Sequence, residues 1–180
     1  IAFIEGEVKA NDYLNKFSKL IRLTLEIVNN DEITISDEIH YLESYVNFER
    51  LRTNKNCLFE FVINDDVLNM NYKIPVMFIQ PFIENAIWHG IMKKDGDKEI
   101  ELTIKEAEGN VLCVIRDNGI GINKARELDQ ISQKKRFFGT ETTENRIKVL
   151  HQNKGVTIET KDISVGVKTG TQVSISFPSA

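Results

Sequence analysis

The chain has 180 residues, of which 41% are hydrophobic and 28% are charged, and its formal net charge is −4 at pH 7. This length allows one hydrophobic core with a helical appendage, as in a soluble globular protein. No apolar run approaches the roughly 18 residues that cross a bilayer, and no Lys/Arg cluster alternates with aromatic residues, which argues against nucleic acid as the main ligand. Because the chain begins without a methionine or a signal peptide, we expect a piece of a longer protein, with any membrane anchor outside it.

Residues 9–28 and 37–53 carry apolar side chains at helical spacing. These are Leu14, Phe17, Leu20, Ile21 and Leu25 in the first stretch, and Ile39, Leu42, Val46 and Leu51 in the second. The pattern predicts two amphipathic helices. Asn29-Asn30-Asp31 is expected to end the first helix. Ser36, followed by the acidic Asp37 and Glu38, is expected to cap the second.

From Cys57 onward the apolar period changes to two, which is typical of strands. The alternating residues are Cys57, Phe59, Phe61 and Ile63; Ile100, Leu102 and Ile104; Val111, Cys113 and Ile115; and Val173, Ile175 and Phe177. Polar residues occupy the opposite face of two of these strands, so we expect a sheet that helices cover on one side and water on the other. The two cysteines lack metal-ligand spacing, and we interpret both as reduced core residues.

Helical patterns also occur at residues 76–92 and at about 142–152, between the predicted strands. The order is therefore strand, helix, strand, strand, long loop, helix, strand, strand. It predicts an α/β (α+β) fold, a two-layer sandwich of a mixed sheet and helices, preceded by the two amphipathic helices. We place the boundary between the helical region, 1–56, and the sheet domain, 57–180, where the period changes.

Two short segments carry the residues most typical of a binding site. The first, Gln80–Gly90, lies on a predicted helix and places Asn85 and His89 four residues apart. On one helix face this spacing lets an amide oxygen bind Mg²⁺ while a neighbour meets phosphate. The second, Asp117–Gly121, ends a strand in a glycine turn, and the carboxylate of Asp117 can accept a hydrogen bond from an exocyclic amine. Taken alone, the first segment also fits an ordinary helix surface and the second an ordinary hairpin turn. The two segments in combination predict an ATP pocket.

Residues 118–143 form a long polar stretch between a predicted strand and a predicted helix, with glycines at both ends. Such a stretch is either a functional lid or an ordinary solvated loop, and both interpretations stay open. Gly139-Thr140 precedes the helix, where backbone N–H groups and the positive end of the helix dipole can meet a phosphate.

In combination, these segments resemble the ATP-binding domain of the GHKL superfamily, and within it the LytS-type sensor histidine kinases. The similar segments are the N box at 80–90, the first glycine box at 117–121, a divergent second glycine box at 139–147, the closing strand from Gly170-Thr171, and the end of a phosphoacceptor domain at 10–26 and 45–52. The resemblance covers nearly the whole chain and implies the Bergerat ATP-binding fold.

The same resemblance implies a role for each matching residue. Asn85 would be the Mg²⁺ ligand, and Asp117 would bind adenine. Gly119, Gly121 and Gly139 would border the ATP lid, and Thr171 would reach the adenine pocket. His89 would lie beside the phosphates. Glu84 would arrange the metal or an attacking group.

The implied function is that of the C-terminal catalytic part of a two-component sensor histidine kinase. It would bind Mg-ATP and pass the γ-phosphoryl to a histidine upstream of Ile1, for relay to a response regulator. The full protein would be a homodimer at the cytoplasmic membrane, with this part in the cytoplasm. Because the family's phosphoacceptor segment is absent and His40 lacks its surroundings, we expect the chain not to phosphorylate itself.

Two other functions compete with the kinase. One is an ATPase or molecular-machine module of the same superfamily, and the other is a nucleotide-binding or dimerisation module without chemistry. The ATPase relatives carry a general-base glutamate four residues before the N-box asparagine, and here that position is Pro81, which can take no proton. Asn85 and Asp117 are both intact, which disfavours a decayed pocket.

Overall fold

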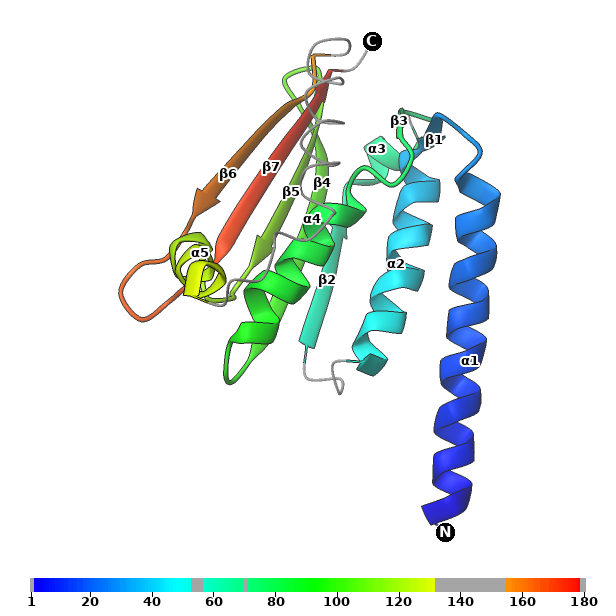
Figure 1. Cartoon of the computed structure of the whole chain (residues 1–180). Helices are drawn as coiled ribbons and strands as arrows, with labels where there is room; N and C mark the ends of the chain where they lie inside the picture. The colour runs from blue at the N-terminus through cyan, green and yellow to red at the C-terminus, as the bar shows by residue number, and fades with distance from the viewer. Residues whose placement is uncertain (1, 53–56, 70, 132–154, 179–180) are drawn as a thin grey trace. The chain divides into compact units, whose positions relative to one another are not determined.

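A computed structural model describes residues 2–52, 57–69, 71–131 and 155–178. The chain divides into two compact units (Figure 1). The helical unit consists of Ile1–Asn56 and Lys73–Phe78, and the sheet unit consists of Cys57–Tyr72 and Ile79–Ala180.

Two long helices and a small two-stranded sheet build the helical unit. The elements are α1 (Ala2–Ile27), β1 (Glu32–Thr34), α2 (Ile35–Arg52) and β3 (Lys73–Pro75). Strands β1 and β3 pair antiparallel, with Glu32 opposite Pro75. The ring of Phe48 on α2 lies 5.0 Å from that of Tyr13 and 5.6 Å from that of Phe17, both on α1. Both predicted helices are therefore present, and their apolar faces meet in part.

The beginning of α2 differs from its prediction. Helix α2 starts at Ile35, so Ser36 lies inside the first turn and does not cap it. The cap is Thr34, whose Oγ1 accepts a hydrogen bond from the Asp37 amide at 3.1 Å and donates one to Asp37 Oδ2 at 2.7 Å. The first bond is that of an ordinary N-cap. The second differs from a capping box, because the carboxylate of Asp37 accepts from the Thr34 hydroxyl and not from the Thr34 backbone amide. The physical reason is that β1 extends through Thr34, which makes it the last residue before the helical turn.

A mixed five-stranded sheet forms the centre of the sheet unit, as predicted. Its strands are β2 (Cys57–Ile63), β4 (Lys98–Ala107), β5 (Asn110–Asp117), β6 (Thr157–Asp162) and β7 (Thr171–Pro178), in the order β2-β4-β5-β7-β6. Strands β2 and β4 are parallel, and the other neighbours are antiparallel. Ile100, Leu102 and Ile104 of β4 are buried while Glu99 and Lys105 are exposed, which confirms the predicted two-faced sheet. Both cysteines are free and buried.

The helix predicted at 76–92 begins later and is not regular. It consists of α4 (Gln80–Asn85), a π-helical turn η1 (Ala86–Gly90) and a 3₁₀ turn η2 (Ile91–Lys93). It lies along one face of the sheet in Figure 1. The late start follows from Met77, whose φ of 52° interrupts any helix there. A short helix, α3 (Asp65–Asn69), follows β2.

A further helix, α5 (Ile122–Ile131), occupies the first part of the stretch that was predicted to be a long loop. That part of the loop prediction is wrong. The apolar residues Ile122, Ala125 and Leu128 of α5 recur at helical spacing, a pattern that the loop prediction overlooked. A distant residue also fixes the first turn of α5, because the side chain of Asp162 at the end of β6 accepts a hydrogen bond from the Asn123 amide. The helix predicted at about 142–152, and Gly139 with it, lie outside the described residues.

Candidate functional site

Three polar residues lie side by side at one end of the sheet. Asp117 is the last residue of β5 and pairs with Thr171, the first residue of β7. Thr171 in turn pairs with Asp162, the last residue of β6. Directly opposite residues of antiparallel strands point to the same face. The sheet register therefore brings together Asp117 and Thr171, which the family resemblance assigned to the same adenine pocket, and it adds Asp162, which the sequence did not indicate.

Asp117 is a buried carboxylate, with only 6% of its surface exposed. Its Oδ1 accepts a hydrogen bond from the Gly119 amide at 2.8 Å. Burial raises the pKa of Asp117 to about 6, although hydrogen bonds from the Gly119 amide and from the amide and hydroxyl of Thr171 oppose this shift. At neutral pH the group is mostly ionised, so it is a preorganised acceptor for an amine.

Three glycines allow the backbone to approach Asp117 closely. A Cβ on Gly90 would lie 2.8 Å from Asp117 Oδ1, and a Cβ on Gly170 would lie 2.2 Å from the Asp117 carbonyl oxygen. A Cβ on Gly119 would lie 2.4 Å from the carbonyl carbon of Gly90. Any larger residue would push these segments apart. The glycines therefore define a tight cradle around one carboxylate, which joins the N-box segment to the first glycine box.

The π-helical turn brings Gly90 to this cradle. The Ile91 amide donates to the carbonyls of Ala86 and Ile87, so the turn closes with an i to i−5 bond beside a normal one. The Ile120 amide then donates to the Gly90 carbonyl at 3.4 Å. Turns of this type often occur at functional sites. The sequence pattern did not predict it.

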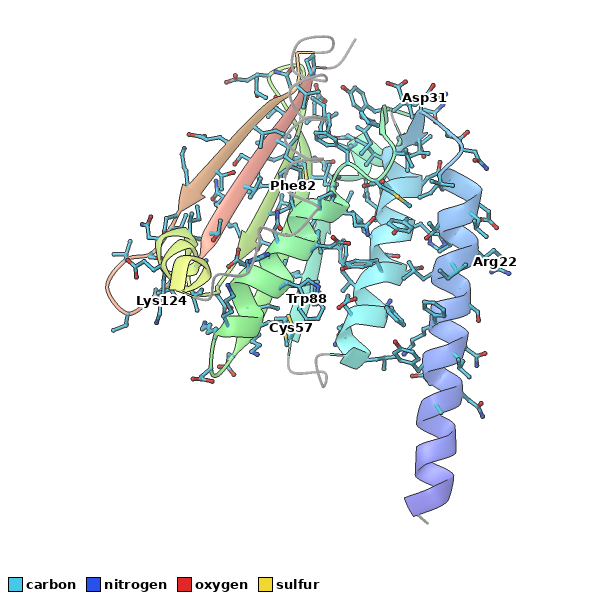
Figure 2. The ribbon with its side chains drawn as sticks, viewed as in Figure 1. Arg22, Asp31, Cys57, Phe82, Trp88 and Lys124 are labelled. Atoms are coloured by element: carbon cyan, nitrogen blue, oxygen red, sulfur yellow. The ribbon has the colours of Figure 1, made fainter. Side chains whose placement is uncertain are left out.

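The remaining N-box residues lie along α4 and η1. The side chain of Glu84 accepts a hydrogen bond from Gln80 Nε2 at 2.7 Å, Asn85 is exposed and His89 is half-buried. The spacing argument for a shared face assumed a regular α-helix, whereas the π turn begins between Asn85 and His89. Figure 2 shows two aromatic residues of this helix, of which Phe82 is buried and Trp88 is 36% exposed.

The donor set around Asn85 is compatible with magnesium. No group of three or more His, Cys, Asp or Glu side chains in the described part of the chain could hold a metal ion by itself. Mg²⁺ commonly binds one or two protein oxygens and completes its shell with water and substrate phosphates. The exposed amide oxygen of Asn85 fits a metal that a nucleotide helps to hold, while the carboxylate of Glu84 is hydrogen-bonded to Gln80.

Asn118 fixes the glycine turn that follows Asp117. Its Oδ1 accepts a hydrogen bond from the Glu99 amide at 2.9 Å, and its Nδ2 donates to the Asp97 carbonyl at 3.2 Å. Sequence reasoning missed this clamp, and also missed Asp162. The Asp162-Ile163-Ser164 segment carried a usable signal, because an aspartate two residues before a small polar residue is typical of an Asx turn.

Comparison with known proteins identifies the family of the chain. The family model described as "Histidine kinase-, DNA gyrase B-, and HSP90-like ATPase" matches residues 73–180, and the model described as "Histidine kinase" matches residues 1–57. Among curated proteins, the chain is similar to sensor histidine kinase YpdA of Escherichia coli (strain K12), at 29% identity over 114 residues, which are 63% of this chain and 20% of that protein. The chain spans less than half the length of the curated relatives it matches.

Two solved structures show the same fold. The catalytic domain of histidine kinase ThkA matches with a TM-score of 0.51 at 20% identity, over 82% of this chain and 95% of that one. Histidine kinase ThkA in complex with response regulator protein TrrA matches with a TM-score of 0.52 at 17% identity, over 94% of this chain and 49% of that one. Among the residues described here, no helix is both long and apolar enough to span a membrane.

Proposed function

The chain belongs to the histidine kinase-, DNA gyrase B- and HSP90-like ATPase family, and from this premise we propose that it is the catalytic, ATP-binding part of a two-component sensor histidine kinase of the LytS type. The match of residues 1–57 to the histidine kinase model supports the kinase over other members of the family. The observation that carries the proposal is the buried carboxylate of Asp117, enclosed by Gly90, Gly119 and Gly170.

In this proposal Asp117 binds adenine. Its ionised carboxylate accepts a hydrogen bond from the exocyclic amine, which ATP has and GTP lacks at the matching position. Thr171, which lies next to Asp117 across the sheet, completes the adenine floor. Gly119, Gly121 and Gly139 border the lid that covers the phosphates.

The N-box residues serve the phosphates. Asn85 holds Mg²⁺ through its amide oxygen, His89 lies beside the phosphates, and Glu84 arranges the metal or the attacking group. The metal would neutralise charge that develops on the phosphoryl oxygens. The chain itself supplies position, because phosphoryl transfer depends mainly on alignment and electrostatics.

The phosphoryl acceptor in this proposal is a histidine upstream of Ile1, and a response regulator receives the group from it. ThkA, a kinase of similar fold, is known in complex with a response regulator protein. A homodimer of the full protein is supported by α1, on which Leu14, Phe17, Ile21 and Leu25 remain exposed at 43% or more. We propose that the full protein is anchored in the cytoplasmic membrane and that this part lies in the cytoplasm.

The ATPase alternative requires a general base four residues before Asn85, and the residue there is a proline. Pro81 occupies the position of the base in the first turn of α4, and the neighbouring acid, Glu84, is engaged by Gln80. A nucleotide-binding module without chemistry stays as the second alternative, and it predicts binding without any phosphoryl transfer.

Calorimetry with the 180-residue chain and labelling of a longer chain test the proposal together. We expect ATP and ADP to bind with Mg²⁺ and GTP to bind more weakly. We also expect a longer chain that includes the upstream histidine to acquire acid-labile phosphate from radiolabelled ATP. Steady ATP hydrolysis that is lost in Glu84→Gln would assign the protein to the ATPases, and binding without labelling in the longer chain would favour the module without chemistry.

A further inference from the structure

Asp162 has no role in the proposed function, yet it lies two strands from Asp117. It ends β6, directly opposite Thr171, which in turn lies opposite Asp117. Asp162 is half-buried. Asp162 is thus the last of three neighbouring residues, Asp117, Thr171 and Asp162, across strands β5, β7 and β6. It lies near the site but is not one of the residues that enclose Asp117.

The carboxylate of Asp162 connects two segments that are distant in sequence. Its Oδ2 accepts a hydrogen bond from the Asn123 amide at 3.1 Å, and its Oδ1 accepts one from the Ser164 amide at 2.9 Å. The Ser164 hydroxyl adds a further bond, and together these interactions lower the pKa of Asp162, so the group is ionised at neutral pH. Charge-assisted bonds of this kind are stronger than neutral ones.

Both connected segments lead to the cradle around Asp117. On one side, Asn123 comes two residues after Gly121, the last glycine of the turn. A Cβ on Gly121 would lie 2.6 Å from Ser164 Oγ and 3.1 Å from each carboxylate oxygen of Asp162, so the turn packs directly on these two side chains. On the other side, the Gly170 amide donates to Ser164 Oγ at 3.3 Å, and Gly170 packs on the backbone of Asp117. One carboxylate thus fixes the end of the glycine turn and, through Ser164, the glycine behind Asp117.

We propose that Asp162 is a positioning residue of the nucleotide site, which holds the Gly119–Gly121 turn and Gly170 in the arrangement that encloses Asp117. This inference rests on the proposed function. Asp162 acts through backbone amides and the Ser164 hydroxyl, without touching the nucleotide. A binding site whose backbone is already held in place binds its ligand more tightly, because less conformational entropy is lost on binding.

If Asp162 only stabilised the fold, its loss would lower the melting temperature without changing nucleotide affinity. A set of variants can separate this role from positioning of the site. Asp162→Ala removes both acceptors, and Asp162→Asn keeps one. Glu159→Gln is the matched control, since it removes a carboxylate from the same strand at an exposed position, where it forms an ion pair with Lys161 at 2.9 Å. Each variant is titrated calorimetrically with ADP and Mg²⁺ at a temperature well below its melting transition, so that the dissociation constant refers to folded chain.

We expect Asp162→Ala to weaken ADP binding roughly tenfold, the factor that matches the loss of one net charge-assisted hydrogen bond. Asp162→Asn should lie between Asp162→Ala and wild type, and Glu159→Gln should stay within roughly twofold of wild type. If Asp162→Ala does not fold, Asp162→Asn and Ser164→Ala carry the test. Their effects should be less than additive in the double variant, because both act through the same link to Gly170.

Two results would count against the inference in different ways. If wild type binds ADP and the Asp162 variants only melt earlier, with unchanged dissociation constants, Asp162 is a structural helix cap and the positioning role is wrong. If wild type itself binds no adenine nucleotide, the proposed function is wrong and the positioning role is wrong with it.

Discussion

Asp117→Asn removes the charge of the buried carboxylate and nearly preserves its shape. The amide oxygen can still accept the hydrogen bond that the Gly119 amide donates at 2.8 Å. What is lost is a charged acceptor for the adenine amine, and the new NH₂ group cannot accept at all. We therefore expect ATP and ADP to bind less tightly by about 1–3 kcal/mol, which is roughly 5- to 150-fold in the dissociation constant.

The same substitution should change how the stability of the fold depends on pH. Burial raises the pKa of Asp117 from 3.8 to about 6 in the folded chain. Between these values the folded state binds more protons than the unfolded state, so the free energy of unfolding falls as the pH rises from about 4 to about 6. The ionised group thus costs the fold at most about 3 kcal/mol at pH 7.5. Asp117→Asn has no group that titrates here, so its free energy of unfolding should lack this fall between pH 4 and pH 6 in denaturant melts.

The pH dependence of binding gives an independent check. Wild-type affinity for ADP should decrease as the pH falls through about 6, because protonation removes the charged acceptor. The Asn variant should lack this component. The informative quantity is the ratio of the two dissociation constants from pH 5 to 8, since titration of the nucleotide phosphates cancels in it.

Calorimetry with ATP, ADP and GTP, together with denaturant melts, measures all of these quantities. Wild type should discriminate against GTP, and the Asn variant should discriminate less. Equal affinity of wild type for ATP and GTP, or unchanged ATP affinity in Asp117→Asn, would refute the assignment of Asp117 to adenine.

Three further predictions concern the metal, the acceptor and the cap. Asn85→Ala should abolish Mg²⁺-dependent nucleotide binding and leave the melting temperature almost unchanged, because an exposed side chain adds little to packing; a variant that melts early but binds normally per folded molecule would make Asn85 structural. The 180-residue chain should stay unlabelled with radiolabelled ATP, and label on His40 or His151 would contradict the acceptor assignment. Thr34→Ala should lower the free energy of unfolding by about 0.5–2 kcal/mol, whereas Ser36→Ala should not; the reverse order in denaturant melts would restore Ser36 as the cap.

The strands could be predicted because their pattern is local. Strands β4 and β5 alternate between a buried and a less buried face, so the period of two at Ile100, Leu102 and Ile104 is sufficient to identify β4. Asp117 and Thr171 were proposed as neighbours by resemblance, and the register of β5 and β7 pairs them directly.

Features that depend on contacts between distant segments could not be predicted. The hydrogen bond from the Asn123 amide to Asp162 spans 39 positions of sequence, so no local pattern could indicate it. The helix itself had a local signal that was missed, because Ile122, Ala125 and Leu128 recur at helical spacing. The π turn that ends at Gly90 fits the close approach of Gly90 to Asp117, which depends on tertiary packing. Helix propensity alone does not describe the π turn.

The path of the chain between the two units has an evolutionary consequence. The chain leaves the helical unit after Asn56, returns at Lys73 and leaves again after Phe78. Recombination at a point between 57 and 72 would separate β1 from its partner β3, and recombination after Phe78 would separate β2 from its parallel neighbour β4. No single breakpoint between α2 and α4 transfers one unit intact. We therefore expect the two units to be inherited together, and relatives with a different first helix to have acquired it by exchange before β1, which leaves the β1–β3 pair intact.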